Sequence, residues 1–184
     1  ATLGLLEDRW IQSLRTAWTR SDTDNSNEFG ANGSTDADRY GVYYQSTYQF
    51  TPASDSSAGN SLTLALDHER EDFSQRGAVA PWGDPNQDES DRNTAVVAEG
   101  LFSPLSQVSL SLSARHDDNS SFDNINTYRA TTAWTDATTG TRLHAALGRG
   151  QKAPTFIERY GYFPGQFTGN PDLEPEESTA WELG

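Results

Sequence analysis

The chain has 184 residues, of which 34% are hydrophobic and 11% are aromatic, and its mean hydropathy is -0.75. The aromatic content argues against wholesale disorder, and a net charge of -14 argues against a nucleic-acid binder, which needs a basic surface. Cysteine is absent, which excludes a disulfide scaffold and a thiolate metal site. Methionine is absent too, so we expect a processed product or an excerpt of a longer protein.

Along the chain, apolar and polar residues alternate with a period of two, which predicts strands. The clearest strand covers residues 40–50, where Tyr40, Val42 and Tyr44 share one face. Tyr40 and Phe50 bracket about 33 Å of strand, or about 23 Å of height at a barrel's tilt, close to the apolar band of an outer-membrane barrel. The other predicted strands cover residues 10–19, 61–69, 94–102, 107–115, 127–134 and 142–147, and an eighth opens at 179–184.

The connections between these strands alternate in length, and no helix is predicted. Long polar loops are expected at residues 22–38, 73–92 and 150–178, and shorter ones at 51–60, 103–106, 116–124 and 135–140. Long loops at one end and short turns at the other are typical of an outer-membrane barrel. The predicted fold class is therefore all-β, an antiparallel up-and-down meander of about eight strands from a larger transmembrane β-barrel. A soluble antiparallel sheet with one solvent-exposed face is the alternative, because its apolar and polar residues alternate in the same way.

Two motifs match known ligand-binding patterns only in part. Residues 148–153 fit the dinucleotide pattern G-x-G-x-x-A, but no strand-helix-strand pattern surrounds them, and Pro154 falls in the first turns of the helix that must follow. The acidic stretch from Asp22 begins like an EF-hand loop, but Asn27 stands where the turn needs glycine. A looser calcium site at Asp22 and Asp24 stays open beside the simpler interpretation of a solvated acidic loop.

Signs of enzyme chemistry are missing from the sequence. The three histidines have no zinc-binding spacing, and no nucleophile motif appears. The sequence therefore predicts no catalytic residue, no cofactor and no enzymatic activity.

The strongest motif lies in the segment 148–184. A Lys-Ala-Pro-Thr run is followed by an Asn-Pro-Asp-Leu-Glu-Pro-Glu run and then by a Trp-Glu pair. Together they predict the end of one strand, a loop rich in proline, glycine and aromatic residues, and the start of the next antiparallel strand. The motif residues are Lys152, Ala153, Pro154, Asn170, Pro171, Leu173, Pro175, Glu176, Trp181 and Glu182.

This motif closely resembles that of TonB-dependent outer-membrane receptors. It departs from the family at Gln151, where many members carry an aromatic residue, and at Glu174, where a base is common. The resemblance implies a parent protein with a plug domain inside a barrel of about 22 strands. Residues 1–184 would then be a partial barrel domain without the plug.

The resemblance also implies a function and partners. The parent would lie in the outer membrane of a Gram-negative bacterium, contact the lipid bilayer, and bind and import a scarce small-molecule nutrient such as a metal chelate. TonB would supply the energy through the plug. A corrinoid or a ferric siderophore is favoured over haem, because no histidine lies between Ala153 and Asn170, and the loop around Tyr160 weakly resembles the vitamin B12 subgroup.

Ligand contacts in such a transporter are expected from aromatic residues of the loops. The candidates are Trp82, Tyr160, Tyr162, Phe163 and Phe167. The alternative for each is a residue of the interfacial girdle or of loop packing.

Two other functional classes remain open from the sequence. One is a secreted β-domain that binds or hydrolyses carbohydrate, although no facing pair of carboxylates is evident. The other is a structural or adhesive outer-membrane barrel. In either barrel interpretation, about eight strands cannot close a large barrel, so the isolated chain is expected to self-associate through its strand edges.

Overall fold

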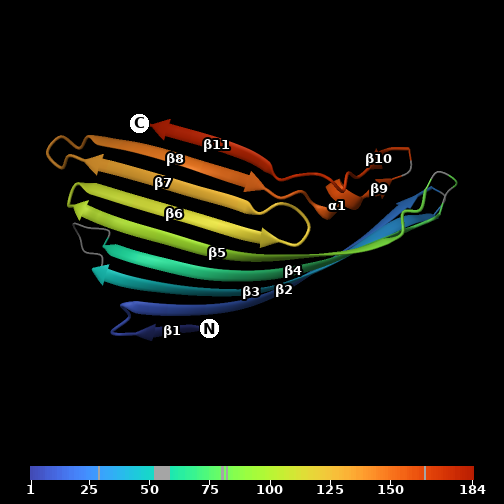
Figure 1. Cartoon of the computed structure of the whole chain (residues 1–184), viewed down its shortest axis with the longest axis horizontal. Coiled ribbons are helices and arrows are strands. Elements are labelled where there is room, and N and C mark those ends of the chain that lie inside the picture. Colours follow the sequence, from blue (N-terminus) through green and yellow to red (C-terminus); the bar gives the residue numbers. More distant parts are fainter. Residues whose placement is uncertain (29, 52–58, 80, 82, 164) are drawn as a thin grey trace.

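The computed structural model describes residues 1–28, 30–51, 59–79, 81, 83–163 and 165–184, and shows one curved antiparallel sheet (Figure 1). Nine strands lie in it in chain order, each hydrogen-bonded to the next. They are β1 (Thr2–Leu5), β2 (Trp10–Asn27), β3 (Gly30–Thr51), β4 (Asn60–Gly77), β5 (Gln87–Leu105), β6 (Val108–Asn119), β7 (Ile125–Thr135), β8 (Arg142–Lys152) and β11 (Glu176–Leu183). The predicted all-β antiparallel meander is confirmed.

The two faces of the sheet differ in chemistry, as a period-two pattern requires. On β4, Leu62, Leu64 and Leu66 are exposed on one face, whereas Asp67 and Glu69 lie on the other. We call the leucine side the outer face and the carboxylate side the inner face. Register pairing extends the outer face across the sheet to further exposed apolar residues, which are Tyr44, Val96, Leu112, Leu147 and Trp181.

Two predicted long loops are wrong, because strands continue through them. The predicted loop at 22–38 is a strand hairpin: β2 runs to Asn27 and β3 starts at Gly30, with their residues paired to the end. In the same way, β4 reaches Gly77 and β5 begins at Gln87. Both faces of these extensions carry polar residues, so the apolar alternation that marks a strand is lost although the backbone ladder continues.

The connection after β8 also differs from the prediction of no helix. It contains the short helix α1 (Phe156–Tyr160) and the two-residue strands β9 (Tyr162–Phe163) and β10 (Phe167–Thr168), which pair with each other. The strand β1 was missed as well, which makes nine strands in the main sheet rather than about eight. The predicted connection at 51–60 lies largely outside the described residues.

The β4–β5, β6–β7 and β8–β11 connections and the tip of the β2–β3 hairpin lie at one end of the sheet, which we call the long-connection end because it holds the longest connection (Figure 1). The turns of β1–β2, β5–β6 and β7–β8 lie at the other end, which we call the tight-turn end. The ends of β2–β5 extend past the other strands at the long-connection end, where α1, β9 and β10 also lie. Few apolar side chains are buried: Phe73, Ala95, Ile125 and Ala133. Within the described part of the chain, no helix has the length and apolar character to cross a membrane.

Candidate ligand-binding site

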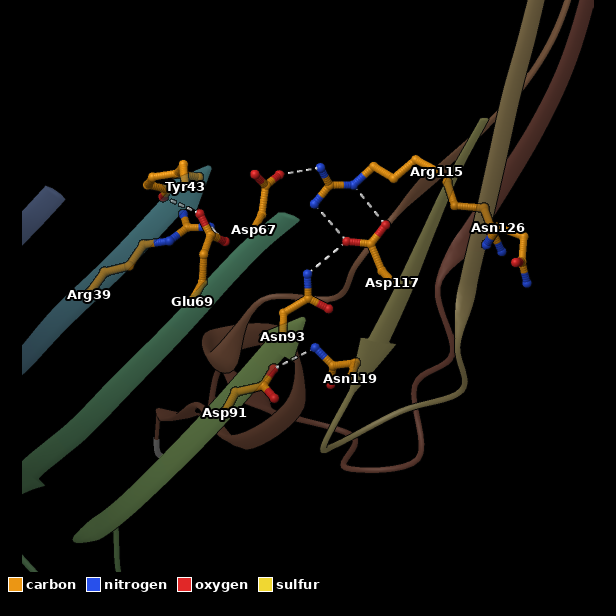
Figure 2. A network of polar contacts seen from close by, with 11 residues as sticks. Arg39, Tyr43, Asp67, Glu69, Asp91, Asn93, Arg115, Asp117, Asn119 and Asn126 are labelled. Carbon is orange, nitrogen blue, oxygen red and sulfur yellow. Dashed lines mark hydrogen bonds and ion pairs between the residues drawn. The ribbon is translucent and has the colours of Figure 1, made fainter. Parts of the chain in front are cut away.

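A polar network covers the inner face of β4–β6 toward the long-connection end (Figure 2). Arg115 lies at its centre and donates two hydrogen bonds of 2.8 Å to Asp117, from Nε and Nη2. Its third nitrogen, Nη1, lies 2.6 Å from Oδ2 of Asp67. Asn93 donates to Asp117 at 2.7 Å. Arg115 and Asp117 together therefore join three neighbouring strands, and the paired bonds between them have the geometry that a planar guanidinium favours.

Two further groups continue this network on either side. Arg39 on β3 forms an ion pair of 2.5 Å with Glu69, which also accepts a hydrogen bond from the hydroxyl of Tyr43. Asp91 on β5 accepts hydrogen bonds from Asn119 at 3.2 Å and from Ser120 at 2.8 Å. Neighbouring strands place these groups side by side because residues two apart on a strand share a face.

The loop between β8 and β11 is organised around one buried cation. Arg159 of α1 is only 5% exposed, and its Nη2 donates to the carbonyl of Ser121 at 2.7 Å. Its Nε lies 3.4 Å from the carbonyl of Pro171, and its guanidinium stacks over Tyr160 with 4.7 Å to the ring centre. Arg159 thereby ties together α1, the β6–β7 connection and the Asn-Pro turn.

The start of α1 is fixed by a capping box. The hydroxyl of Thr155 accepts a hydrogen bond from the backbone N–H of Glu158, and the Glu158 carboxylate accepts from the backbone N–H of Thr155 at 2.8 Å. The Thr155 backbone hydrogen bond lowers the pKa of Glu158. This reciprocal arrangement stabilises the first turn of a helix that is too short to be stable by itself.

Two glutamines attach the loop to the sheet. The buried side chain of Gln75 donates to the carbonyl of Tyr162 at 2.9 Å and accepts from its backbone N–H at 3.2 Å. Gln87 donates to Gln75 at 2.9 Å and also to the carbonyl of Tyr160. Phe73 stacks on Phe156, with 5.4 Å between ring centres.

Between the inner face and this loop lies a cavity of about 540 Å³. Its sheet wall is polar, and its loop wall includes Pro154 and Phe156. Glu71 in the sheet wall has a raised pKa, mainly because of burial and further because of the charges of Asp91 and Glu69. The cavity therefore combines hydrogen-bonding groups on one side with apolar and aromatic groups on the other, as small-molecule sites usually do.

Comparison with known proteins assigns the chain to a protein family. Residues 2–184 match the family described as TonB dependent receptor-like, beta-barrel. The chain belongs to the TonB-dependent receptor family. It is 30% identical over 183 residues to the vitamin B12 transporter BtuB of Photobacterium profundum, an alignment that covers 100% of this chain and 27% of that protein.

A solved structure supports the same fold. The siderophore receptor PirA from Pseudomonas aeruginosa matches with a TM-score of 0.61 at 14% identity, over 95% of this chain and 36% of that one. The chain thus spans about a quarter of the curated relative and about a third of the solved structure. The relative BtuB is a transporter, which agrees with the prediction of no enzymatic activity.

Most of the family-motif residues build the loop and the return strand. The Lys152 ammonium lies 3.5 Å from the Glu158 carboxylate, and Ala153 and Pro154 line the cavity. Asn170 donates its backbone N–H to the carbonyl of Glu158 at 3.0 Å, accepts from Asp172 through its side chain, and accepts from the backbone N–H of Leu173 at 3.2 Å.

The remaining motif residues lie on or next to β11. Pro175 comes directly before the strand, and Glu176 pairs with Lys152 in register. Trp181 is 79% exposed on the outer face, and the Glu182 carboxylate lies 3.1 Å from His144.

Among the described residues, the predicted aromatic candidates do not line the main cavity. Phe163 and Phe167 pack on each other with 6.3 Å between ring centres, and Tyr160 packs on Phe156 with the two rings tilted and 6.2 Å between their centres. Tyr162 and Phe163 line a separate cavity of about 490 Å³. Trp82 lies outside the described residues. The ligand roles of all five stay predictions.

Sequence reasoning missed three residues that shape the site. Phe122 and Phe156 are the aromatic residues of the main cavity, and Arg159 is its buried cation. Phe156 directly follows the Lys-Ala-Pro-Thr run, so its place beside the family motif was an available signal. Arg159 gave no such signal, because burial of a charge depends on partners from distant segments.

The calcium candidates lie on the outer face of β2. Asp22 forms an ion pair of 2.9 Å with Arg20, and a hydrogen bond shared with Asp36 lowers the pKa of Asp22 and raises the pKa of Asp36. Asp24 pairs with Ser34 in register. Among the described residues, no group of three carboxylates or histidines has metal-binding geometry. Calcium binding here stays a prediction.

Proposed function

We propose that this chain forms part of the barrel wall of an outer-membrane active transporter of a Gram-negative bacterium. The transporter binds a scarce nutrient, a corrinoid or a ferric siderophore, and imports it with energy that TonB supplies through a plug domain. Membership of the family and the exposed apolar outer face support this proposal.

The cavity under the β8–β11 loop is the observation that carries the proposal. It lies at the long-connection end, which is the cell-surface end in outer-membrane barrels. A polar sheet wall and an aromatic loop wall suit a ligand that has both hydrogen-bonding groups and a flat or apolar body. We assign Phe156 and Phe122 to this contact, and the aromatic residues Tyr160, Tyr162, Phe163 and Phe167 to the approach above it.

Uptake by the complete receptor tests this function. The receptor is expressed in a Gram-negative strain without its own receptors, and uptake of labelled cyanocobalamin and of a ferric siderophore is measured with and without TonB. We expect saturable, TonB-dependent uptake of one of them. Uptake of neither ligand, or uptake unchanged by loss of TonB, would contradict the proposal.

A substitution tests whether the ligand binds in the cavity. Phe156→Ala should weaken binding of the transported ligand about five- to thirtyfold, as loss of a central aromatic contact usually does. The matched control is Phe102→Ala, since Phe102 lies on β5 near the tight turn at the opposite end. Equal binding of the ligand by both variants would show that the ligand does not bind in the cavity.

We also propose that the isolated chain self-associates. Strands β1 and β11 are the two edges of the main sheet in the described part of the chain. Unpaired edges present free N–H and C=O groups and pair readily with other edges. Size-exclusion chromatography of the isolated chain should show dimers or larger species, and a stable monomer in detergent-free buffer would contradict this.

A further inference from the structure

One row of outer-face residues crosses four strands at the upper border of the apolar band. Trp18 pairs in register with Tyr40, Tyr40 with Arg70, and Arg70 with Arg92. The next outer-face positions toward the tight-turn end are increasingly apolar and reach Leu66 and Val96. Beyond the row, toward the long-connection end, the outer face is polar. The row therefore lies where lipid chains give way to headgroups, if the chain spans the membrane as proposed above.

The aromatic half of the row has the character of an interfacial girdle. Trp18 and Tyr40 stack with 6.4 Å between ring centres and are 62% and 48% exposed. The indole N–H of Trp18 donates to Asp38 at 2.9 Å, on the polar side of the row. Aromatic residues with one polar end favour the level of lipid headgroups. Because Arg70 and Arg92 lie in the same row, they are expected at the same depth in the membrane.

The basic half of the row consists of Arg70 and Arg92, which lie directly opposite each other on paired strands. Arg70 is paired with Asp72 at 2.8 Å and still has a half-exposed side chain. Arg92 is exposed, and in the described part of the chain it has no ion-pair partner. The nearest acid on this face of β6, Asp118, pairs in register with Thr94 instead. Like charges directly opposite each other on paired strands are destabilising, so a bound anion would relieve this pair.

A groove leads from Arg70 toward the apolar band. It has a volume of about 370 Å³, and its lining includes Trp18, Tyr40, Val42, His68 and Arg70. Its lining offers aromatic and aliphatic surface to a lipid chain, and the guanidinium of Arg70 stands at its polar end. A phosphate with an attached acyl chain fits this combination better than a free anion does.

We propose that Arg70 and Arg92 bind the phosphate of an anionic lipid in the outer leaflet, with its acyl chain along the groove. Guanidinium groups recognise phosphate through paired, charge-assisted hydrogen bonds, and a lipid in this position would shield the arginine pair. The proposal rests on the membrane placement in the proposed function. It concerns the outer wall and not the nutrient cavity, so the two are tested separately.

Native mass spectrometry of the complete receptor in detergent tests this site. Dioleoyl phosphatidic acid, dioleoylglycerol and inorganic phosphate are titrated separately, without any nutrient. The test variant is Arg70→Gln with Arg92→Gln. The matched control is Arg20→Gln with Arg76→Gln, which removes the same charge from outer-face residues that are ion-paired with Asp22 and Asp88 beyond the row.

The expected result is a loss of affinity for phosphatidic acid of about fivefold for each arginine and about twentyfold for both. The control pair should stay within about twofold of the wild type. A variant with lysine at both positions keeps the charge and should keep most of the affinity, which separates loss of the site from loss of folding.

Three results would overturn the site. They are equal loss in the control pair, equally tight binding of dioleoylglycerol, and displacement of the lipid by inorganic phosphate at matched concentration. Nutrient uptake by the Arg70 and Arg92 variant is measured in parallel. Retained uptake with lost lipid binding shows a folded receptor and separates this outcome from failure of the proposed transport function.

Discussion

Two regions at the long-connection end have similar polar composition but are built differently. The extended ends of β2 and β3 are strands whose residues pair with each other to the hairpin tip, with one shift in register between Asn25 and Ser26. The connection from Lys152 to Glu176 is mostly irregular, and side chains hold it: Arg159, Gln75 and the Thr155–Glu158 capping box. The first region needs no particular side chain to stay ordered, whereas the second depends on a few.

This difference bears on function. A hairpin held by its backbone tolerates many side chains, so its acidic and polar residues are free to vary without loss of structure. A loop held by named side chains presents a defined surface, here the roof of the cavity. Substitutions that remove those side chains should loosen the roof, and equivalent substitutions in the hairpin should not.

Arg159→Ala is expected to have the largest effect. The carbonyls of Ser121 and Pro171 lose their charged donor, and Tyr160 loses its stacked cation. Hydrogen bonds to a charged group contribute about 1.5–3 kcal/mol each, so loss of the 2.7 Å bond to Ser121 alone should make opening of the loop roughly 10- to 150-fold more frequent. Hydrogen exchange at the Gly169 and Asn170 amides, which bond across the loop, measures this. Unchanged exchange there would show that Arg159 does not organise the loop.

Gln75→Ala should have a smaller effect, confined to the junction of the two regions. Both backbone groups of Tyr162 lose a buried partner, which corresponds to about 1.5 kcal/mol, or roughly tenfold faster exchange of that amide. Gln107→Ala is the control, because Gln107 is exposed in the β5–β6 turn at the opposite end. The same acceleration at Tyr162 in both variants would rule out the proposed attachment.

Thr155→Ala tests the comparison with a matched pair. Loss of a helix N-cap costs about 1 kcal/mol, so exchange within α1 should accelerate about fivefold. The control is Thr23→Ala on β2, where Thr23 is exposed and its backbone pairs with Thr35. That change should stay within about 0.5 kcal/mol. Similar losses of stability in the two variants would show that the hairpin and the β8–β11 connection do not differ in their dependence on side chains.

Glu71→Gln should have the smallest effect, and it depends on pH. Burial raises the pKa of Glu71 above its ordinary value of 4.5, so the folded protein favours the protonated form. Stability is therefore lost as the pH rises from 4.5 through the folded pKa, and it stays lost at neutral pH. The variant should melt at a higher temperature than the wild type at about pH 7 and at the same temperature at about pH 4. A lower melting temperature at neutral pH would contradict the assigned cause.

Sequence reasoning succeeded where one face of a strand is apolar. The strands around Tyr44, Leu64 and Leu112 were predicted because alternation marks the outer face directly. It failed for β2 beyond Arg20 and for β4 beyond Phe73, because both faces there are polar and pairing leaves no mark on composition.

The site was harder to predict than the fold. The family motif located the loop, since residues such as Pro154 and Asn170 build it. The motif did not reveal the cavity wall, because Asn93 and Asp67 reach the Arg115–Asp117 pair only through the register of β4, β5 and β6. Register and loop docking are tertiary properties, and a single sequence does not encode them in any local pattern.

The central claim is that the two faces of this sheet meet different environments, lipid outside and the transport path inside. This chain has no cysteine, so single cysteines placed along β4, in a complete receptor whose other cysteines are replaced by serine, report each face directly. Leu64→Cys and Leu66→Cys should react in the membrane with a lipid-soluble maleimide and not with a charged one. Thr63→Cys and Ala65→Cys should show less reaction with the lipid-soluble reagent. Equal labelling of neighbouring positions by the lipid-soluble reagent would contradict the account.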